Sequence, residues 1–232
     1  MWFPALAGAV VYLDTSVIGQ TLLGQPIVAC VLYGLLVDRP EVGLFFGVLF
    51  ELIWLANLQI GAAKFCEGSL GAIIATAVAA SVAPSEVTGE PAWIVLLIAM
   101  SLGLVFAHLG RELAPIVRRT MNGVAERYVS DSALGKSGAA WVLTALGVHV
   151  LAGAAFTALG VGTGHVLLRL YFGEFYALGP GANVVQATDV LCAGMWPSML
   201  GVGAAAALLQ LVSRKDWPWA IVGGAVLGVL LP

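Results

Sequence analysis

Three acidic residues, Asp14, Glu51 and Glu67, stand inside or beside apolar runs and are the first candidates for chemistry. The clearest case is Glu51, which interrupts the apolar stretch GVLFELIWL. An ionised side chain at the centre of a bilayer is costly, so acids in such runs usually face a cavity and have a function. We therefore interpret these three residues as candidates for a binding site.

The polar residues around Glu51 suit a ligand that carries several hydroxyl groups. Asn57 and Gln59 follow it in the same stretch. Carboxylate oxygens accept hydrogen bonds from hydroxyls, and side-chain amides both donate and accept them. An ion pathway would sooner show rings of acids or a file of arginines at helical spacing, and the sequence has neither. The combination favours a sugar over an ion.

Lys64 and Glu67 allow two interpretations. They lie three positions apart, so on one helix they could neutralise each other. They could equally line the same binding site. Glu51, in contrast, has no basic residue within ten positions on either side, which favours a functional role for it.

Other kinds of site find little support in the sequence. Cys30, Cys66 and Cys192 lie in separate apolar segments without metal-ligand spacing, and we interpret them as packing residues. We expect no metal and no cofactor. There is no basic cluster typical of a nucleic-acid surface.

The elements that must position these residues are membrane helices. The chain is 60% hydrophobic and only 10% charged, with a mean hydropathy of +0.99, whereas a soluble domain has roughly 25% charged residues. Several charge-free windows reach the length of about 20 residues that a spanning helix needs. The alternation of a membrane β-barrel is absent. We predict an all-α, polytopic integral membrane protein in which residues 1–232 form one domain.

The first third, residues 1–84, is less regular than the rest. Short apolar segments flank Glu51, and Pro26, Pro40 and several glycines interrupt the remainder. Helix-breaking residues at membrane depth are tolerated where protein or a cavity satisfies the backbone, and such segments are typical of transporter sites. We predict broken or re-entrant helices here. The alternative is tight helix packing through Gly43 and Gly47, which have GxxxG spacing.

Basic residues set the expected orientation. Half of the ten lysines and arginines fall between Arg111 and Lys136, so residues 111–138 are predicted to form a cytoplasmic loop. Hydrophobic residues at helical spacing in this loop indicate an amphipathic helix on the membrane surface or a docking face for a soluble partner. The spans before it should end near residue 110, and residues 139–232 should form C-terminal helices.

Residues 13–76 resemble the IIC subunit of the mannose/fructose/sorbose family of bacterial phosphotransferase systems. The family pattern has a Leu-Asp pair, a glutamine, a proline, a glycine-rich turn, a Glu-Leu-(Ile/Leu)-Trp-Leu segment and Ile-Gly-Ala-Ala. In this chain the matching positions, in the same order and spacing, are Leu13-Asp14, Gln20, Pro26, Glu51–Leu55 and Ile60–Ala63.

The resemblance implies a sugar permease that works with partners. Family members pair with a IID membrane subunit to bind a hexose or amino sugar and carry it across the bacterial inner membrane. A cytoplasmic IIB subunit, phosphorylated on histidine by IIA, then phosphorylates the sugar. The chain itself would be a non-catalytic, multi-pass subunit, and we expect it to form an oligomer.

The resemblance also assigns roles to individual residues. It implies that Glu51 binds sugar hydroxyls, with Gln20, Asn57 and Gln59 as neighbours, and that Asp14 is a structural or gating acid. Lys64 and Glu67 lie where the chain departs from the family, because KFCEG replaces the usual Pro-Asp after Gly-Ala-Ala. Two alternatives follow from this departure and from the acids: a sugar-sensing regulator without transport, and an ion-coupled transporter in which Asp14 or Glu51 carries a proton.

Overall fold

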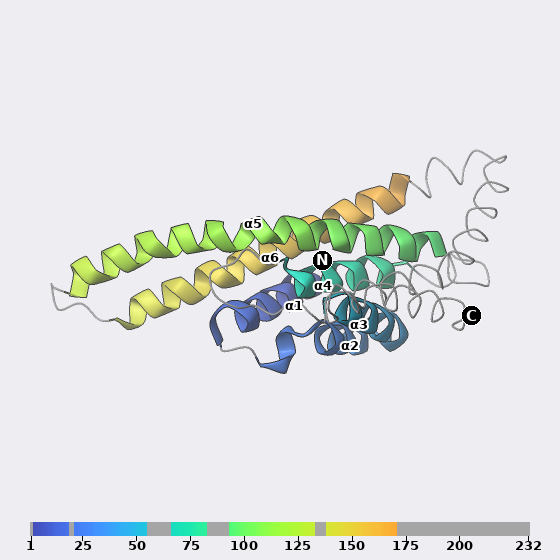
Figure 1. Ribbon diagram of the computed structural model, residues 1–232, viewed down its shortest axis with the longest axis horizontal. Helices are drawn as coiled ribbons and strands as arrows, with labels where there is room; N and C mark the ends of the chain where they lie inside the picture. The colour runs from blue at the N-terminus through green and yellow to red at the C-terminus, as the bar shows by residue number, and fades with distance from the viewer. Residues whose placement is uncertain (1, 19–20, 55–65, 83–92, 133–137, 171–232) are drawn as a thin grey trace, which may run out of the picture.

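The computed structural model describes residues 2–18, 21–54, 66–82, 93–132 and 138–170, and every element within these ranges is helical (Figure 1). The all-α prediction is therefore confirmed for the described residues. The elements, in chain order, are α1 (Trp2–Leu13), the π-helical turn η1 (Asp14–Ile18), the 3-10 turn η2 (Leu22–Gly24), α2 (Pro26–Leu36), α3 (Pro40–Trp54), α4 (Gly68–Ala80), α5 (Trp93–Ser132) and α6 (Ala139–Leu170).

Helices α2 and α3 form a tight antiparallel hairpin. Each begins with a proline, which fits the first helical position because its missing N–H would have no partner there. The turn between them places Asp38 at a φ of 56°, a left-handed conformation that aspartate adopts more readily than most residues. The Arg39 side chain donates to the carbonyl oxygen of Val82 at 3.3 Å and so ties this turn to the end of α4.

Gly43 and Gly47 allow the two helices of the hairpin to touch through their backbones. A Cβ on Gly43 would collide with the carbonyl group of Cys30 and would lie 3.1 Å from Cα of Gly34. A Cβ on Gly47 would lie 3.0 Å from Cα of Ile27. The GxxxG spacing thus serves close packing of α3 on α2. Whether the helices of the first third are broken or re-entrant stays a prediction.

The Gly43 contact predicts opposite effects for two glycine-to-alanine substitutions. Gly43→Ala should lower the free energy of unfolding by about 1–3 kcal/mol, because the new methyl group meets backbone atoms that cannot move cheaply. Gly123→Ala in α5 meets nothing within 4 Å, and should raise stability by up to about 1 kcal/mol through helix propensity. Thermal unfolding in detergent would measure both. Equal shifts would contradict the packing described for Gly43.

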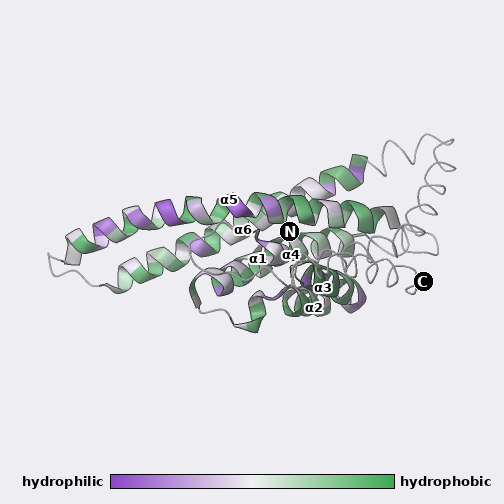
Figure 2. Ribbon diagram, in the orientation of Figure 1, coloured by the Kyte–Doolittle hydropathy of each residue, from purple (hydrophilic) through white to green (hydrophobic). Residues whose placement is uncertain are grey.

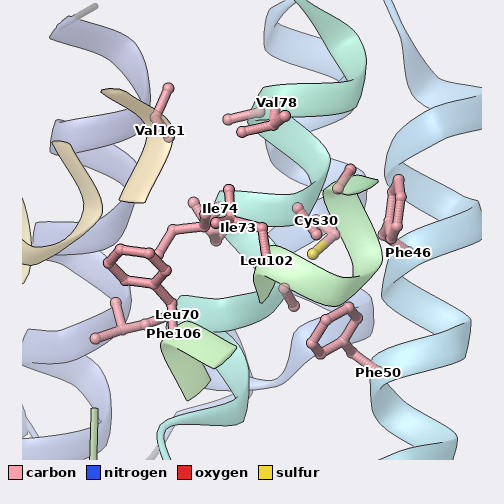
Figure 3. Packing of buried hydrophobic residues seen from close by; sticks show 14 of the residues in the cluster. Cys30, Phe46, Phe50, Leu70, Ile73, Ile74, Val78, Leu102, Phe106 and Val161 are labelled. Atoms are coloured by element: carbon pink, nitrogen blue, oxygen red, sulfur yellow. The ribbon is translucent and has the colours of Figure 1, made fainter. Parts of the chain in front are cut away.

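Helix α4 is the centre of the bundle. Its residues from Leu70 to Ala79 are buried, and α4 contacts each of α1, α2, α3, α5 and α6. Figure 3 shows Leu70, Ile73 and Val78 of α4 among side chains of the neighbouring helices. The 13 residues of α4 span only about 20 Å at 1.5 Å per residue. A short helix enclosed in this way can end inside the protein, because its terminal groups meet other protein rather than lipid.

Helices α5 and α6 are the longest elements and run antiparallel beside each other (Figure 1). They contain 40 and 32 residues, and both are long and apolar enough to cross a membrane by length and composition. The sequence led us to expect that α5 would end near residue 110, and that expectation was wrong. Helix α5 continues to Ser132 with Pro115 inside it, so most of the predicted 111–138 loop is a direct extension of α5.

Helix α1 packs along one face of α6. A Cβ on Gly8 would lie 2.6 Å from Cβ of Thr157, and a Cβ on Gly153 would lie 2.7 Å from Cβ of Tyr12. Tyr12 also stacks on His149, with ring centroids 6.0 Å apart. Small residues on both helices permit this approach. The packing brings the C-terminal end of α1 close to the start of α4.

Candidate functional site

Asp14 organises the turn that follows α1. It is almost fully buried, with 2% of its surface exposed. Its Oδ1 accepts hydrogen bonds from the backbone N–H of Thr21 at 3.0 Å and from the Thr21 hydroxyl at 2.5 Å, and its Oδ2 accepts from the backbone N–H of Gly24 at 2.6 Å. Three donors compensate a buried carboxylate. The geometry gives Asp14 a structural role in holding η2.

A second link joins η2 to α4. The hydroxyl of Ser69, in the first turn of α4, donates to the carbonyl oxygen of Gly24. A Cβ on Gly24 would lie 2.8 Å from Oδ2 of Asp14, so only glycine fits this contact. Asp14, Gly24 and Ser69 thus form one chain of hydrogen bonds from the end of α1 to the start of α4.

Glu51 lies near the C-terminal end of α3 and reaches the start of α2. Its Oε2 accepts a hydrogen bond from the backbone N–H of Ile27 at 3.2 Å. The side chain of Gln25, at the N-cap position, makes no capping hydrogen bond, so Glu51 provides an acceptor for this helix end. A carboxylate is also favoured there by the helix dipole. Glu51 is half-buried. Among the described residues, no donor contacts its second carboxylate oxygen, so this oxygen can accept a further hydrogen bond.

Glu67 immediately precedes α4 and is buried, with 8% of its surface exposed. Its backbone N–H donates to the carbonyl oxygen of Ala107 in α5 at 2.9 Å. A Cβ on Gly110 would lie 2.6 Å from Cβ of Glu67, so α5 approaches this residue closely. Glu67 is therefore fixed against α5.

Trp54 supplies a donor that the sequence analysis left without a role. Its indole ring covers Gly68, where a Cβ would lie 2.7 Å from Cγ and Nε1 of the ring, and it lies 5.9 Å from the His108 ring. The Nε1–H of Trp54 is buried without a hydrogen-bond partner among the described residues. A buried donor without a partner is uncommon and requires an explanation. A bound ligand with an acceptor oxygen would provide one.

These contacts gather the described candidates at one end of the short helices. The end of α1 and η2, the start of α2, the end of α3 and the start of α4 all meet there. Among the described residues, the Asp14 carboxylate accepts three hydrogen bonds and the Glu51 carboxylate accepts one. Glu67 is held against α5 through its backbone N–H. Gln20, Asn57, Gln59 and Lys64 lie outside the described residues.

The arrangement offers hydrogen-bond acceptors and a donor in a largely apolar setting. Glu51 supplies a carboxylate oxygen, Trp54 an indole N–H, and Ser69 a hydroxyl. A polyhydroxylated ligand can use each of these groups. Within the part of the chain that the structure describes, no group of three histidine, cysteine or acidic residues is placed to hold a metal ion.

The signals for Trp54 and Ser69 were weak in the sequence. Trp54 stands inside the quoted motif, but a tryptophan in an apolar run is usually a packing residue. Its unpartnered N–H depends on the contact with Gly68, which lies on another helix. Ser69 is one hydroxyl in a helix start and becomes notable only through its bond to Gly24.

Comparison with known proteins agrees with the fold and the motifs. A solved structure described as "Structure of membrane protein" is similar over 95% of this chain and 82% of that chain, with a TM-score of 0.57 and 17% sequence identity, which shows the fold alone. No curated protein matches the chain. The family model "PTS system sorbose-specific iic component" matches residues 2–230.

The family match covers nearly the whole chain, far beyond the motif-bearing first third. It confirms the resemblance found in residues 13–76 and the prediction of an integral membrane protein. The chain therefore belongs to the family of sorbose-specific IIC components of the phosphotransferase systems, as a membrane-embedded sugar-permease component.

Proposed function

We propose that this chain binds a hexose or amino sugar and carries it across the bacterial inner membrane for phosphorylation on the cytoplasmic side. Phosphorylated IIB would donate the phosphoryl group, IIA would rephosphorylate IIB, and a IID subunit would complete the membrane unit. The observation that carries the proposal is the placement of Glu51. Glu51 lies near the end of α3 and its Oε2 accepts a hydrogen bond at the start of α2. Its other carboxylate oxygen would accept a hydrogen bond from the ligand.

The proposed division of labour follows the helices. Residues 1–84 would carry the sugar site, with Glu51 as the principal acceptor and Trp54 as a donor. Gln20, Asn57, Gln59, Lys64 and Glu67 would be further contacts. Asp14 would hold the site together rather than touch the sugar, because three donors already occupy its carboxylate. The α5 extension would stand on the cytoplasmic side, and residues 139–232 would complete the multi-pass fold.

The chain would position the sugar, and its partners would perform the chemistry. Phosphoryl transfer to a hydroxyl depends mostly on alignment and on stabilisation of charge. A carboxylate that accepts from one sugar hydroxyl fixes the direction of the others. This role requires no catalytic residue, metal or cofactor in the chain.

Equilibrium binding tests the proposal directly. Labelled hexoses and amino sugars would be offered to the chain reconstituted with its IID subunit, without phosphoenolpyruvate. We expect saturable binding of at least one of these sugars, and competition by its unlabelled form. A chain that binds none of them would contradict the proposed function.

The unpaired Trp54 donor gives a sharper prediction. Trp54→Phe removes an N–H that has no partner among the described residues, so the melting temperature should stay the same or rise slightly. The same change should weaken sugar binding by roughly 2- to 10-fold, the net value of one hydrogen bond. Titration calorimetry would measure the affinity, and Trp141→Phe in α6 is the control. Equal affinity in both variants would remove Trp54 from the site.

A further inference from the structure

His108 is the one titratable side chain in the uncharged part of α5. This part runs from Trp93 to Gly110 and is about 27 Å long at 1.5 Å per residue, close to the roughly 30 Å thickness of a hydrocarbon core. Figure 2 shows this half of α5 as mainly hydrophobic and its continuation as mainly hydrophilic. The His108 side chain is nevertheless exposed. An imidazole that faced lipid at this depth would lack a hydrogen-bond partner, so its exposure indicates a polar neighbour.

One hydrogen bond fixes the tautomer of this imidazole. The Nδ1 of His108 lies 3.0 Å from the carbonyl oxygen of Leu104, one turn earlier in α5. A carbonyl oxygen can only accept, so Nδ1 carries the proton and Nε2 of the neutral ring is an acceptor. No donor among the described residues contacts Nε2. His108 therefore presents an acceptor to which a ligand can donate.

The ring of His108 lies beside the candidate site. Its centroid is 5.9 Å from that of Trp54, at the end of α3. The carbonyl oxygen of the preceding residue, Ala107, accepts from the backbone N–H of Glu67 at 2.9 Å. His108 is thus at the level where α4 begins, on the side of α5 that meets Trp54.

Trp54 and His108 offer complementary groups to a ligand. The Nε1–H of Trp54 is a buried donor without a partner among the described residues, and Nε2 of His108 is an acceptor. A hydroxyl group can accept from the first and donate to the second, whereas a ring oxygen or a carbonyl oxygen can only accept. Two hydrogen bonds of about 2.9 Å are also long enough to bridge two rings at this separation.

We propose that His108 and Trp54 together recognise one hydroxyl of the bound sugar, with Nε2 of His108 accepting its O–H. His108 is then a specificity-determining residue, because it favours a sugar with a hydroxyl at this position over one that carries only an acceptor there. The assignment rests on the proposed function, since it requires that a sugar binds at the end of α3.

His149 shows how a packing histidine differs and provides the matched control. Its Nδ1 bonds in the same way to the carbonyl oxygen of Ala145, at 2.8 Å. Its ring, however, is half-buried and stacks on Tyr12 of α1, with an interplanar angle of 28°. His149→Phe should therefore leave sugar affinity unchanged.

Three substitutions of His108 separate a ligand contact from packing. His108→Gln keeps an acceptor near the position of Nε2, His108→Asn reaches only the position of Nδ1, and His108→Phe keeps a ring against Trp54 without an acceptor. We expect His108→Asn and His108→Phe to weaken sugar binding by roughly 2- to 10-fold, the net value of one hydrogen bond, and His108→Gln to retain near-wild-type affinity. Titration calorimetry on the chain reconstituted with its IID subunit would measure this, with mannose, fructose, sorbose and glucosamine as probes.

Deoxy analogues of the probe that binds show whether the contact is direct. For the analogue without the recognised hydroxyl, His108→Phe should cause no further loss of affinity, whereas for the other analogues it should cause its full loss. An equal loss with every analogue would overturn the proposal. If the wild-type complex binds a probe and His108→Phe binds it equally well, the assignment of His108 fails alone. If the wild-type complex binds none of the four probes, the proposed function fails as well.

Discussion

Glu51→Gln is expected to weaken sugar binding by roughly 10- to 100-fold, because a hydrogen bond to a charged group contributes about 1.5–3 kcal/mol. The substitution keeps an oxygen that can accept from the N–H of Ile27, so the start of α2 should remain satisfied. Membrane insertion and the melting temperature should therefore change little. Titration of sugar into the reconstituted chain, together with thermal unfolding, would measure both effects.

A second acid on the same helix provides the control. Glu41 lies in the first turn of α3 and is exposed, at the opposite end from Glu51. Glu41→Gln should leave sugar affinity unchanged. If the two variants bind sugar equally well, Glu51 is not the principal acceptor, and its bond to Ile27 is its only role.

Asp14→Ala should have the largest effect on stability. It leaves the backbone N–H groups of Thr21 and Gly24 and the Thr21 hydroxyl without their acceptor. The N–H of Gly24 is buried and costs about 1–3 kcal/mol when it is left unsatisfied, whereas Thr21 is exposed and loses only the net value of its two bonds, roughly 0.5–1.5 kcal/mol each. We therefore expect a loss of about 2 kcal/mol or more in the free energy of unfolding. Chemical or thermal unfolding in detergent would show it.

Asp38→Asn is the matched control for Asp14, because Asp38 is exposed and asparagine tolerates its left-handed conformation. It should unfold like the wild type. Wild-type stability in Asp14→Ala would show that the hydrogen bonds around η2 do not hold the end of α1 to the start of α4.

The sequence was informative about helix class and less so about helix ends. Composition alone predicts a helical membrane protein, since lipid leaves few other structures available. The end of α5 was misplaced because Arg111 closes the apolar window. The buried positions nevertheless keep one phase through that point, as Phe106, Gly110, Val117 and the partly buried Val124 show. Continuity of the buried face, rather than charge, indicates that this helix continues past Arg111.

The sequence also identified one residue of the candidate site but not the contacts that this residue makes. Glu51 could be selected from one run of letters, because an isolated acid in an apolar helix is conspicuous. Its bond to Ile27 could not be predicted, since it depends on the close approach of α2 and α3 through Gly43 and Gly47. Trp54 could not be selected for a related reason, because its unpaired N–H follows from the packing of α3 on α4.

The chemical form of the accumulated sugar is the most direct test of the central claim. Vesicles would contain the chain and its IID subunit, with IIA, IIB and phosphoenolpyruvate-driven phosphorylation on the cytoplasmic face, and labelled sugar would be added on the other side. We predict that sugar phosphate accumulates, and only while phosphoenolpyruvate and the soluble partners are present. Accumulation of unmodified sugar driven by a pH gradient, or binding without any accumulation, would contradict the assignment of this chain as the permease subunit of a phosphotransferase system.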